Sequence, residues 1–415
     1  MPNSIQHSAA MFFLRLAWRN LWRNRKRTLI AAASVFFAVF LAVLMSSMTS
    51  GQHEYMIHSA VSMYTGHMQV HGRGYWENRS LDRSMPLDPA LLRAARALPG
   101  VACATPRFET GALISHGLQT KVSPVIGIDA ANEHALTGLG KRVVRGTPYA
   151  AWKSGAIVAE GLARLLKADV GDSIVVYGQG YQGVTAARVV RIASIARFPI
   201  PDLDNAMLYL PLAEAQELFA APDRATAIAM LLRDGADEAE VASALRGHVA
   251  ADMEVLTWRD MMPELLQAIA ADTGGTVIML LILYVVIGFG IFGTVMMMTA
   301  ERSREFGITI AVGMQRGRLI AVTVLESIIV SMLGALAGIA ASIPVLVYFT
   351  RHPIVFGGDY AKAMLAYGME PILPLSLEPM VFAWQGVIVF ALGALSALYP
   401  VFVLHRLEPV RAMRG

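Results

Sequence analysis

The chain has 415 residues, of which 55% are hydrophobic and only 16% charged, and its mean hydropathy is +0.50. A soluble domain carries about 25% charged residues, so this composition excludes an ordinary soluble enzyme. The net charge of +4 does not indicate nucleic-acid binding, because residues 51–272 hold 20 Lys and Arg against 24 Asp and Glu, and the rest holds 15 against 7. The single cysteine, Cys103, excludes an intramolecular disulfide and a cysteine-rich zinc site.

The first predicted element is an amphipathic helix over residues 12–27, FFLRLAWRNLWRNRKR. Its two faces differ in polarity, with apolar Phe13, Leu16, Ala17 and Leu21 on one and Arg15, Arg19 and Arg23 on the other. Such a helix is typical of a segment that lies in a membrane interface, where Trp18 and Trp22 would meet the headgroups. We therefore assign residues 1–28 to a cytosolic amphipathic segment.

Four apolar runs follow, at residues 29–50, 276–300, 319–350 and 380–404. Each is long enough to be a transmembrane helix, since about 20 apolar residues cross the ~30 Å hydrocarbon core. The first run exceeds a signal-peptide core of about 7–15 residues, so we do not expect it to be cleaved. We assign residues 273–404 to one domain that holds the second to fourth spans, followed by a cytosolic tail at 405–415.

Basic residues lie on one side of these spans. The segments 15–27, 302–318 and 406–414 are rich in Arg, whereas the connection 351–378 has two basic residues against three acidic ones. Because Lys and Arg favour the cytosolic side and anionic lipid, we expect both termini in the cytosol. Residues 51–272 then lie outside the cytosol, which for the inner membrane of a Gram-negative bacterium means the periplasm. The basic surplus marks topology and not a nucleic-acid surface.

Residues 51–272 predict a mixed α/β domain inserted between the first and second spans. The alternating and periodic apolar patterns indicate strands at 121–128, 156–159, 173–177, 187–197, 206–210 and 226–232, and helices at 89–98, 160–168, 212–219 and 238–248. The fold class is therefore an α-helical membrane protein with four transmembrane helices and an α/β extracytoplasmic domain. We expect the Gly- and Pro-rich connection 351–379 to be an ordered loop, with a flexible connector as the alternative.

The motifs that could mark chemistry have structural explanations. Residues 178–183, GQGYQG, match a dinucleotide fingerprint, but a strand-like segment follows where a helix is needed, which favours a hairpin. His53 and His58 are spaced i,i+5 and diverge on a helix, and His67 and His71 lie on a predicted strand, so we expect no metal site. The sequence contains no Walker A motif, and we expect a non-catalytic subunit whose ATP and Mg²⁺ are bound by a partner.

The connection 300–318, AERSREFGITIAVGMQRGR, opens with charges and has an apolar middle that a plain solvated turn would not need. A helix here would present its charged residues and Phe306 to a cytosolic partner. Glu326 is the only charged residue of the third run, and an ionisable group within a membrane span is a candidate functional residue. Two interpretations of Glu326 stay open: an interfacial or interhelical hydrogen bond, or a direct part in gating.

Together these segments resemble the FtsX/MacB-type permeases of ABC transporters, most closely the LolC/LolE-like branch that releases lipoproteins. The similar stretches are LAWRNLWRNRKRT, TGHMQVHGRGYWEN, the helix–Gly-Asp–strand element at 161–177, ERSREFGITIAVGMQRGRLI, LESIIVSMLGALAG with Glu326, and the terminal YPVFVLHRLEPVRAMRG. Phe306 stands where this family usually has Ile. The resemblance covers nearly the whole chain, and it is more specific for the superfamily than for the cargo.

The resemblance implies a permease of the mechanotransmission type. Two such subunits, identical or paired with a homologue, would bind two cytosolic ABC ATPases, with a periplasmic lipoprotein carrier or adaptor as a further partner. Efflux with a separate ATPase and regulation of a wall hydrolase are the alternatives. The implied coupling segment comprises Glu301, Arg302, Arg304, Glu305, Phe306, Gly307 and Gly313. Lipid-linked cargo would contact Phe36, Phe37, Phe40 and Met45, which are otherwise ordinary lipid-facing residues.

Overall fold

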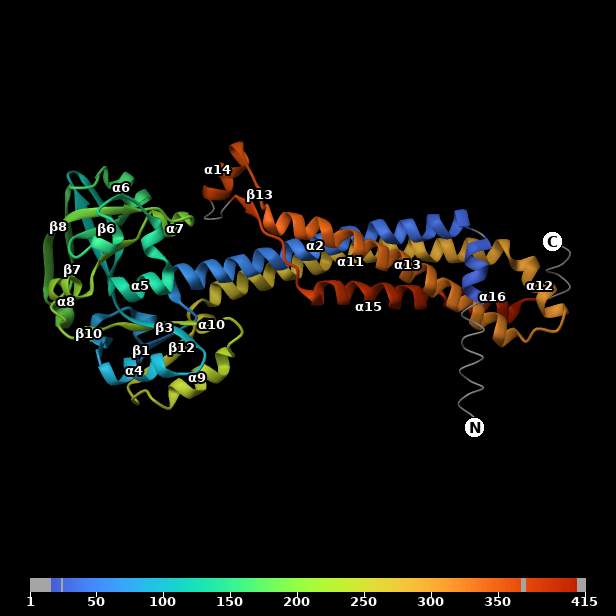
Figure 1. The fold of residues 1–415 in the computed structure, drawn as a ribbon, viewed down its shortest axis with the longest axis horizontal. Helices are drawn as coiled ribbons and strands as arrows, with labels where there is room; N and C mark the ends of the chain where they lie inside the picture. The colour runs from blue at the N-terminus through green and yellow to red at the C-terminus, as the bar shows by residue number, and fades with distance from the viewer. Residues whose placement is uncertain (1–15, 24, 367–370, 409–415) are drawn as a thin grey trace. The chain divides into compact units, whose positions relative to one another are not determined.

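The computed structural model describes residues 16–23, 25–366 and 371–408, and the chain divides into two compact units (Figure 1). The helical unit is built from the described parts of segments 1–54, 269–354 and 373–415. The α/β unit is built from segments 55–268 and 355–372.

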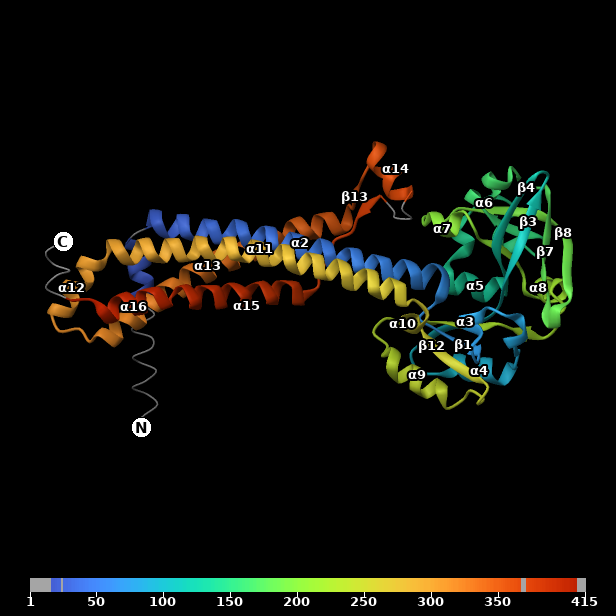
Figure 2. The ribbon, with the colours of Figure 1, turned by 180° about the vertical axis from the view of Figure 1, so that it is seen from behind.

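Four apolar helices dominate the helical unit, and they run side by side in both ribbon views (Figures 1 and 2). They are α2 (Arg25–Ala60), α11 (Pro263–Glu301), α13 (Arg316–Arg351), and α15 (Pro379–Ser396) continued by α16 (Leu398–Arg406). All four are long and apolar enough to cross a membrane, which confirms the four predicted spans. The helices extend beyond the apolar runs, most of all at the start of α11 and the end of α2.

Small residues let α2 and α13 approach closely. A Cβ on Gly334 would lie 2.6 Å from the carbonyl oxygen of Ala32, and one on Gly338 would lie 2.8 Å from that of Phe36. Membrane helices associate through such close packing, because the hydrophobic effect provides no driving force between apolar helices that are already surrounded by lipid tails. The neighbouring contact, between α2 and α11, is filled by branched side chains, including Val35, Val39, Val43, Ile287, Ile291 and Val295.

Residues 16–23 form the described part of the predicted N-terminal amphipathic helix; residues 12–15 lie outside the described segments. The apolar face is buried at Ala17 and Leu21, and Leu21 packs against Ala31 and Val330. Trp18 and Trp22 are exposed and contact each other edge to face. The burial follows the predicted polarity of this helix.

The α/β unit contains a closed ring of six strands. β3 (Val101–His116), β4 (Gln119–Ile128), β9 (Leu208–Pro211), β6 (Ala156–Ala159), β8 (Thr185–Ala196) and β7 (Ser173–Gln179) pair in this order, and β7 pairs back to β3. Closure removes the free edges from these strands. β5 (Val143–Gly146) pairs with β8.

A second group of strands extends from the first half of β3. β11 (Ala227–Leu232) pairs with β3, β1 (Met68–Gly72) with β11, and β12 (Met253–Thr257) with β1, all antiparallel. Two hydrophobic cores result. Phe108 and Ile114 of β3 belong to the core of the ring, whereas Val101 and Ala104 of the same strand belong to the second core. The long strand β3 is therefore shared.

Short amphipathic helices cover these cores. The predicted helices are present as α4 (Pro89–Ala97), α6 (Glu160–Leu166), α8 (Leu212–Leu218) and α9 (Glu238–Arg246). Leu162 and Leu166 of α6 pack into the ring core, and Leu91 of α4 and Leu245 of α9 pack into the second core. Asp88 and Asp237 accept backbone hydrogen bonds as N-caps of α4 and α9.

The segment 178–183 contains the last two residues of β7, where Gly178 pairs with Ala186, and the turn of the antiparallel hairpin that leads to β8. This confirms the hairpin interpretation of the Gly-rich motif. The connection after α13 is more regular than either expectation for it. It contains α14 (Gly358–Ala366) and a two-stranded sheet of β13 (Ile354–Val355) and β14 (Ile372–Leu373), so the prediction of a loop there was wrong over these elements.

A buried ion cluster ties η1 (Val61–Thr65), the π-helix that follows α2, to the sheet. Arg107 of β3 forms a bidentate pair with Glu133 of α5 (Ala130–Thr137), at 3.0 Å from Nε to Oε2 and 2.7 Å from Nη2 to Oε1. Arg107 also donates to the backbone carbonyl of Tyr64, whose hydroxyl donates to Glu109 at 2.9 Å. Arg107 also forms an ion pair with Glu109 at 3.4 Å. Burial alone lowers the pKa of Arg107, but the carboxylates of Glu133 and Glu109 raise it overall.

His71 of β1 and His67, which directly precedes this strand, both have structural partners. His71 is fully buried, its Nδ1 donates to the carbonyl of Thr226 at 2.8 Å, and its ring stacks on Tyr75. Burial lowers the pKa of His71 to about 4. His67 accepts from the backbone N–H of Leu232 at 3.2 Å. Over the described segments, no group of three or more His, Cys, Asp or Glu could hold a metal ion.

Candidate coupling site in the helical unit

The connection between α11 and α13 folds into a short helix, α12 (Ser303–Ala311). Arg302, with φ −95° and ψ 3°, separates α11 from α12. Gly313 has φ +107°, a conformation that L side chains rarely adopt, so glycine is required where the chain leaves α12. The predicted charged segment is thus a helix bounded by two breaks.

Phe306 holds α12 against the rest of the helical unit. It is 2% exposed and packs with Leu319 of α13 and Leu404 of α16. The expectation that Phe306 faces a partner was therefore wrong, because the apolar face of α12 turns inward at this position. The neighbouring Gly307 is also buried. Ile308 and Val312, at 47% and 84% exposed, are the apolar side chains that α12 and its end present outward.

Glu326 is the centre of a polar network that joins three segments. Its carboxylate forms an ion pair with Arg302 and accepts a hydrogen bond from the side-chain amide of Asn20 at 2.7 Å. The side chains of Glu326 and Arg302 are 6% and 15% exposed, respectively. Glu326 therefore makes the interhelical hydrogen bond that was one of its two interpretations. The bond connects α13 to the N-terminal helix and to the start of α12.

The network continues to the surface through Glu305. Glu305 pairs with Arg23 at 2.8 Å and with Arg302 at 3.4 Å. The guanidinium of Arg302 also lies over the ring of Phe306, at 5.2 Å from its centroid. Arg302 thus contacts three side chains at once: the buried Phe306, the buried Glu326 and the exposed Glu305. Any displacement of α12 changes these contacts together.

The remaining predicted residues of the coupling segment, Glu301 and Arg304, are exposed at the same end of the unit. The sequence singled out Glu326 and Arg302 separately but did not reveal that they pair. It did not reveal Asn20 at all. A signal existed in hindsight, because an uncompensated carboxylate near the end of a membrane helix needs a cation or donor from a neighbouring segment.

The four residues proposed to contact cargo, Phe36, Phe37, Phe40 and Met45, all belong to α2. Phe36 stacks on Phe40 and meets Phe37 edge to face, and Phe37 is 63% exposed. The backbone of Phe36 faces Gly338 of α13. A groove lies between α2, α11 and α15, at the opposite end of the helices from α12.

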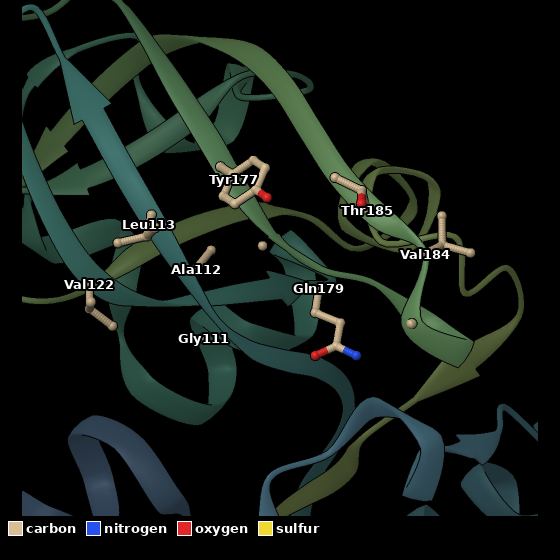
Figure 3. Close-up of a pocket in the computed structure, with 10 residues that line it drawn as sticks. Gly111, Ala112, Leu113, Val122, Tyr177, Gln179, Val184 and Thr185 are labelled. Atoms are coloured by element: carbon tan, nitrogen blue, oxygen red, sulfur yellow. The ribbon is translucent and has the colours of Figure 1, made fainter.

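The α/β unit has an open groove on the outside of its strand ring (Figure 3). Its volume is about 520 Å³, and Leu113, Val122, Tyr177 and Val184 present exposed side chains around it. None of its lining residues is charged; the others are Gly111, Ala112, Gly178, Gln179, Gly183 and Thr185. These lining side chains offer no acid–base pair and no set of metal ligands.

Comparison with known proteins identifies both parts of the chain. The model of the MacB-like periplasmic core domain matches residues 28–248, and that of the FtsX-like permease C-terminal domain matches residues 277–409. The chain is 22% identical to the macrolide export ATP-binding/permease protein MacB of Agrobacterium fabrum, over 81% of this chain and 53% of that protein. It is 22% identical to MacB 1/2 of Paracoccus denitrificans, over 97% of this chain and 58% of that protein.

The chain thus spans little more than half the length of these curated relatives. Among solved structures, the periplasmic region of MacB from Actinobacillus actinomycetemcomitans is similar at 13% identity and a TM-score of 0.34. That match covers 49% of this chain and 94% of that structure.

Proposed function

Because this chain belongs to the family defined by the MacB-like periplasmic core domain, here followed by an FtsX-like permease C-terminal domain, we propose that it is the transmembrane subunit of an ATP-driven ABC transporter. The ATP-binding part lies outside residues 1–415, since this sequence has no Walker A motif. The chain itself performs no hydrolysis. It converts movement of an ATPase into movement of its own helices.

The observation that carries this proposal is the anchored helix α12. It exposes Arg304, Glu305, Ile308 and Val312, while Phe306 and Arg302 fasten it to α13. A force on the exposed side is therefore passed directly to α13 and, through Asn20, to the N-terminal helix. In the proposed arrangement ATP-driven closure of two ATPase subunits moves α12 of each of two permease subunits. The ATPases lie in the cytosol and the α/β unit in the periplasm.

Two cargo classes follow from different observations. The sequence motifs resemble the LolC/LolE-like branch and favour extraction of lipoproteins or other lipid-linked molecules from the inner membrane. The relatives are macrolide export proteins, which favours MacB-like efflux with a separately encoded ATPase. Regulation of a periplasmic wall hydrolase is a third possibility. Material that co-purifies with the intact complex separates the three: a lipid-anchored protein, a small amphiphile with an adaptor, or a bound hydrolase.

The coupling assignment is tested on the chain purified together with its native ATPase. We expect Glu305→Ala/Phe306→Ala to abolish stimulation of the ATPase by this subunit, because truncation of a buried Phe costs about 3–5 kcal/mol of packing and frees α12. Phe289→Ala/Glu264→Ala is the matched control, since Phe289 is 72% exposed on α11 and Glu264 is exposed. If the double variant assembles and stimulates hydrolysis like the control, the assignment is wrong.

A further inference from the structure

The helical unit holds a groove between α2, α11 and α15. Its volume is about 570 Å³, and all of its lining residues belong to the helical unit. Ser46, Thr49 and Ser50 of α2 form its half-buried floor, and α11 and α15 form its walls. The wall residues Val277, Leu281, Met380 and Trp384 are 55–58% exposed, so the groove opens between α11 and α15.

The inner end of this groove is closed by polar groups that satisfy one another. The hydroxyl of Tyr284 donates to Oε1 of Gln385 at 2.8 Å, and Nε2 of Gln385 donates to the hydroxyl of Ser46 at 3.3 Å. Gln385 is only 2% exposed. Thr49 and Thr276 hydrogen-bond each other at 3.2 Å between the helices. These groups leave the middle of the groove to Leu280, Leu281, Val381, Trp384 and Ile388.

The outer end of the groove is acidic. Glu378 and His53 line it, and His53 pairs with Asp272 at 2.7 Å. The lining contains no Lys or Arg. A cationic group therefore finds the carboxylate of Glu378 in the lining and that of Asp272 beside His53, whereas an anionic group finds no Lys or Arg side chain in the lining. Trp384 lies on the wall, and Trp is enriched where membrane helices meet the headgroup region.

We propose that this groove binds phosphatidylethanolamine. One acyl chain lies along the apolar walls, and the ammonium group donates charge-assisted hydrogen bonds to Glu378 and Asp272. The floor from Ser46 to His53 spans about 10 Å of helix, less than half of the ~30 Å core, so the groove holds the part of the chain nearest the headgroup. Lipid is the occupant because the exposed walls at Val277, Leu281, Met380 and Trp384 are apolar and give water few hydrogen-bond partners.

This inference goes beyond the transport proposal and requires only that the four helices lie in a membrane. The groove is distinct from Phe36, Phe37, Phe40 and Met45, none of which lines it. A bound lipid here would wedge between α11 and α15 at the end opposite to α12. Loss of the bound lipid can be measured on this chain alone, without an ATPase subunit.

The test is lipid retention by the full-length chain, reconstituted in nanodiscs of equal palmitoyl-oleoyl phosphatidylethanolamine and phosphatidylglycerol and then measured by native mass spectrometry. We expect the wild-type chain to keep one phosphatidylethanolamine after the other lipids are stripped. Leu281→Trp should abolish this retention by filling the groove. Leu336→Trp is the matched control, because Leu336 is equally exposed at 58% but lies on α13, outside the groove.

The headgroup assignment has its own pair of variants. Asp272→Asn/Glu378→Gln should keep a retained lipid but lose the preference for phosphatidylethanolamine, whereas Glu264→Gln should keep the preference. Equal retention of phosphatidylglycerol by the wild-type chain would overturn the headgroup assignment. The site assignment would be overturned if Leu281→Trp retained lipid as the wild-type chain does. It would also be overturned if neither the wild-type chain nor Leu336→Trp retained any lipid.

Discussion

Arg302 and Glu326, 24 residues apart in sequence, form an ion pair that joins the start of α12 to the interior of α13. Both side chains are largely buried, so each charge depends on the other. Removing one partner of a buried pair leaves an uncompensated charge, whereas replacing both by apolar residues is often nearly neutral.

A double-mutant cycle at this pair should therefore be strongly non-additive. We expect Glu326→Leu and Arg302→Leu each to destabilise the chain by about 3–5 kcal/mol, and the double variant to recover most of the loss. Thermal unfolding in detergent, followed by tryptophan fluorescence, measures this. Additive losses would mean that the two residues act independently.

The bidentate pair of Arg107 and Glu133 should dominate the stability of the α/β unit. We expect Glu133→Gln to cost about 3–5 kcal/mol, because the buried guanidinium then keeps only the longer ion pair with Glu109, at 3.4 Å. Arg145 and Asp169 supply the control, since Nη1 of Arg145 donates to both carboxylate oxygens at 2.9 Å on the exposed surface. Asp169→Asn should cost no more than about 1 kcal/mol. Comparable shifts in the unfolding midpoint would contradict the role of burial.

The contact of α2 with α13 should tolerate no side chain at Gly334. A Cβ there would lie 2.6 Å from the carbonyl oxygen of Ala32 and 2.8 Å from Cβ of Val35, so Gly334→Ala should cost about 1–3 kcal/mol through overpacking. Gly293 of α11 has nothing within 4 Å of its Cβ position. Gly293→Ala should leave the unfolding midpoint unchanged or raise it, because Ala has the higher helix propensity.

Acid should weaken the α/β unit through His71. Its pKa in the folded chain is about 4, below the ordinary 6.5. Between these values the unfolded chain binds a proton that the folded chain does not. Stability therefore falls as the pH drops through this window, by about 3 kcal/mol in total.

Unfolding midpoints of the wild-type chain and of His71→Asn, measured from pH 7 to pH 4, check this prediction. At pH 7 the His71→Asn variant should have a lower unfolding midpoint than the wild-type chain, but its midpoint should fall by less as the pH drops. Burial also lowers the pKa of His67, so a smaller pH dependence should persist in the variant. An unchanged slope would show that His71 is not the group that titrates.

Patterns carried by single elements were predictable from the sequence. The four apolar runs, the Gly178 hairpin and the helices at Pro89, Glu160, Leu212 and Glu238 are set by composition, periodicity and turn residues. Helix α5 was missed, because AANEHALT is short and lacks an apolar period, although Asp129 supplies its N-cap. The ends of α2 and α11 were misjudged since both helices continue past their apolar runs.

Relations between distant residues were not predictable. The cluster of Arg107, Glu109 and Glu133 depends on a strand and a helix meeting, and each residue alone looks like a solvated charge. The inward turn of Phe306 depends on the angle at which α12 leaves Arg302, which hydrophobicity alone does not encode. These contacts between distant residues determine the geometry of the candidate coupling site. The segment that forms the site was therefore predictable from the sequence, but its geometry was not.

The strand β3 has a consequence for how the α/β unit comes apart. Its first half completes one hydrophobic core and its second half closes the six-strand ring. Removing β3 from either hydrophobic core exposes the other core as well. The six-strand ring and the second group of strands should therefore unfold in a single cooperative event. The amides of β3 should then exchange with deuterium only through global opening, with one common opening free energy along the strand.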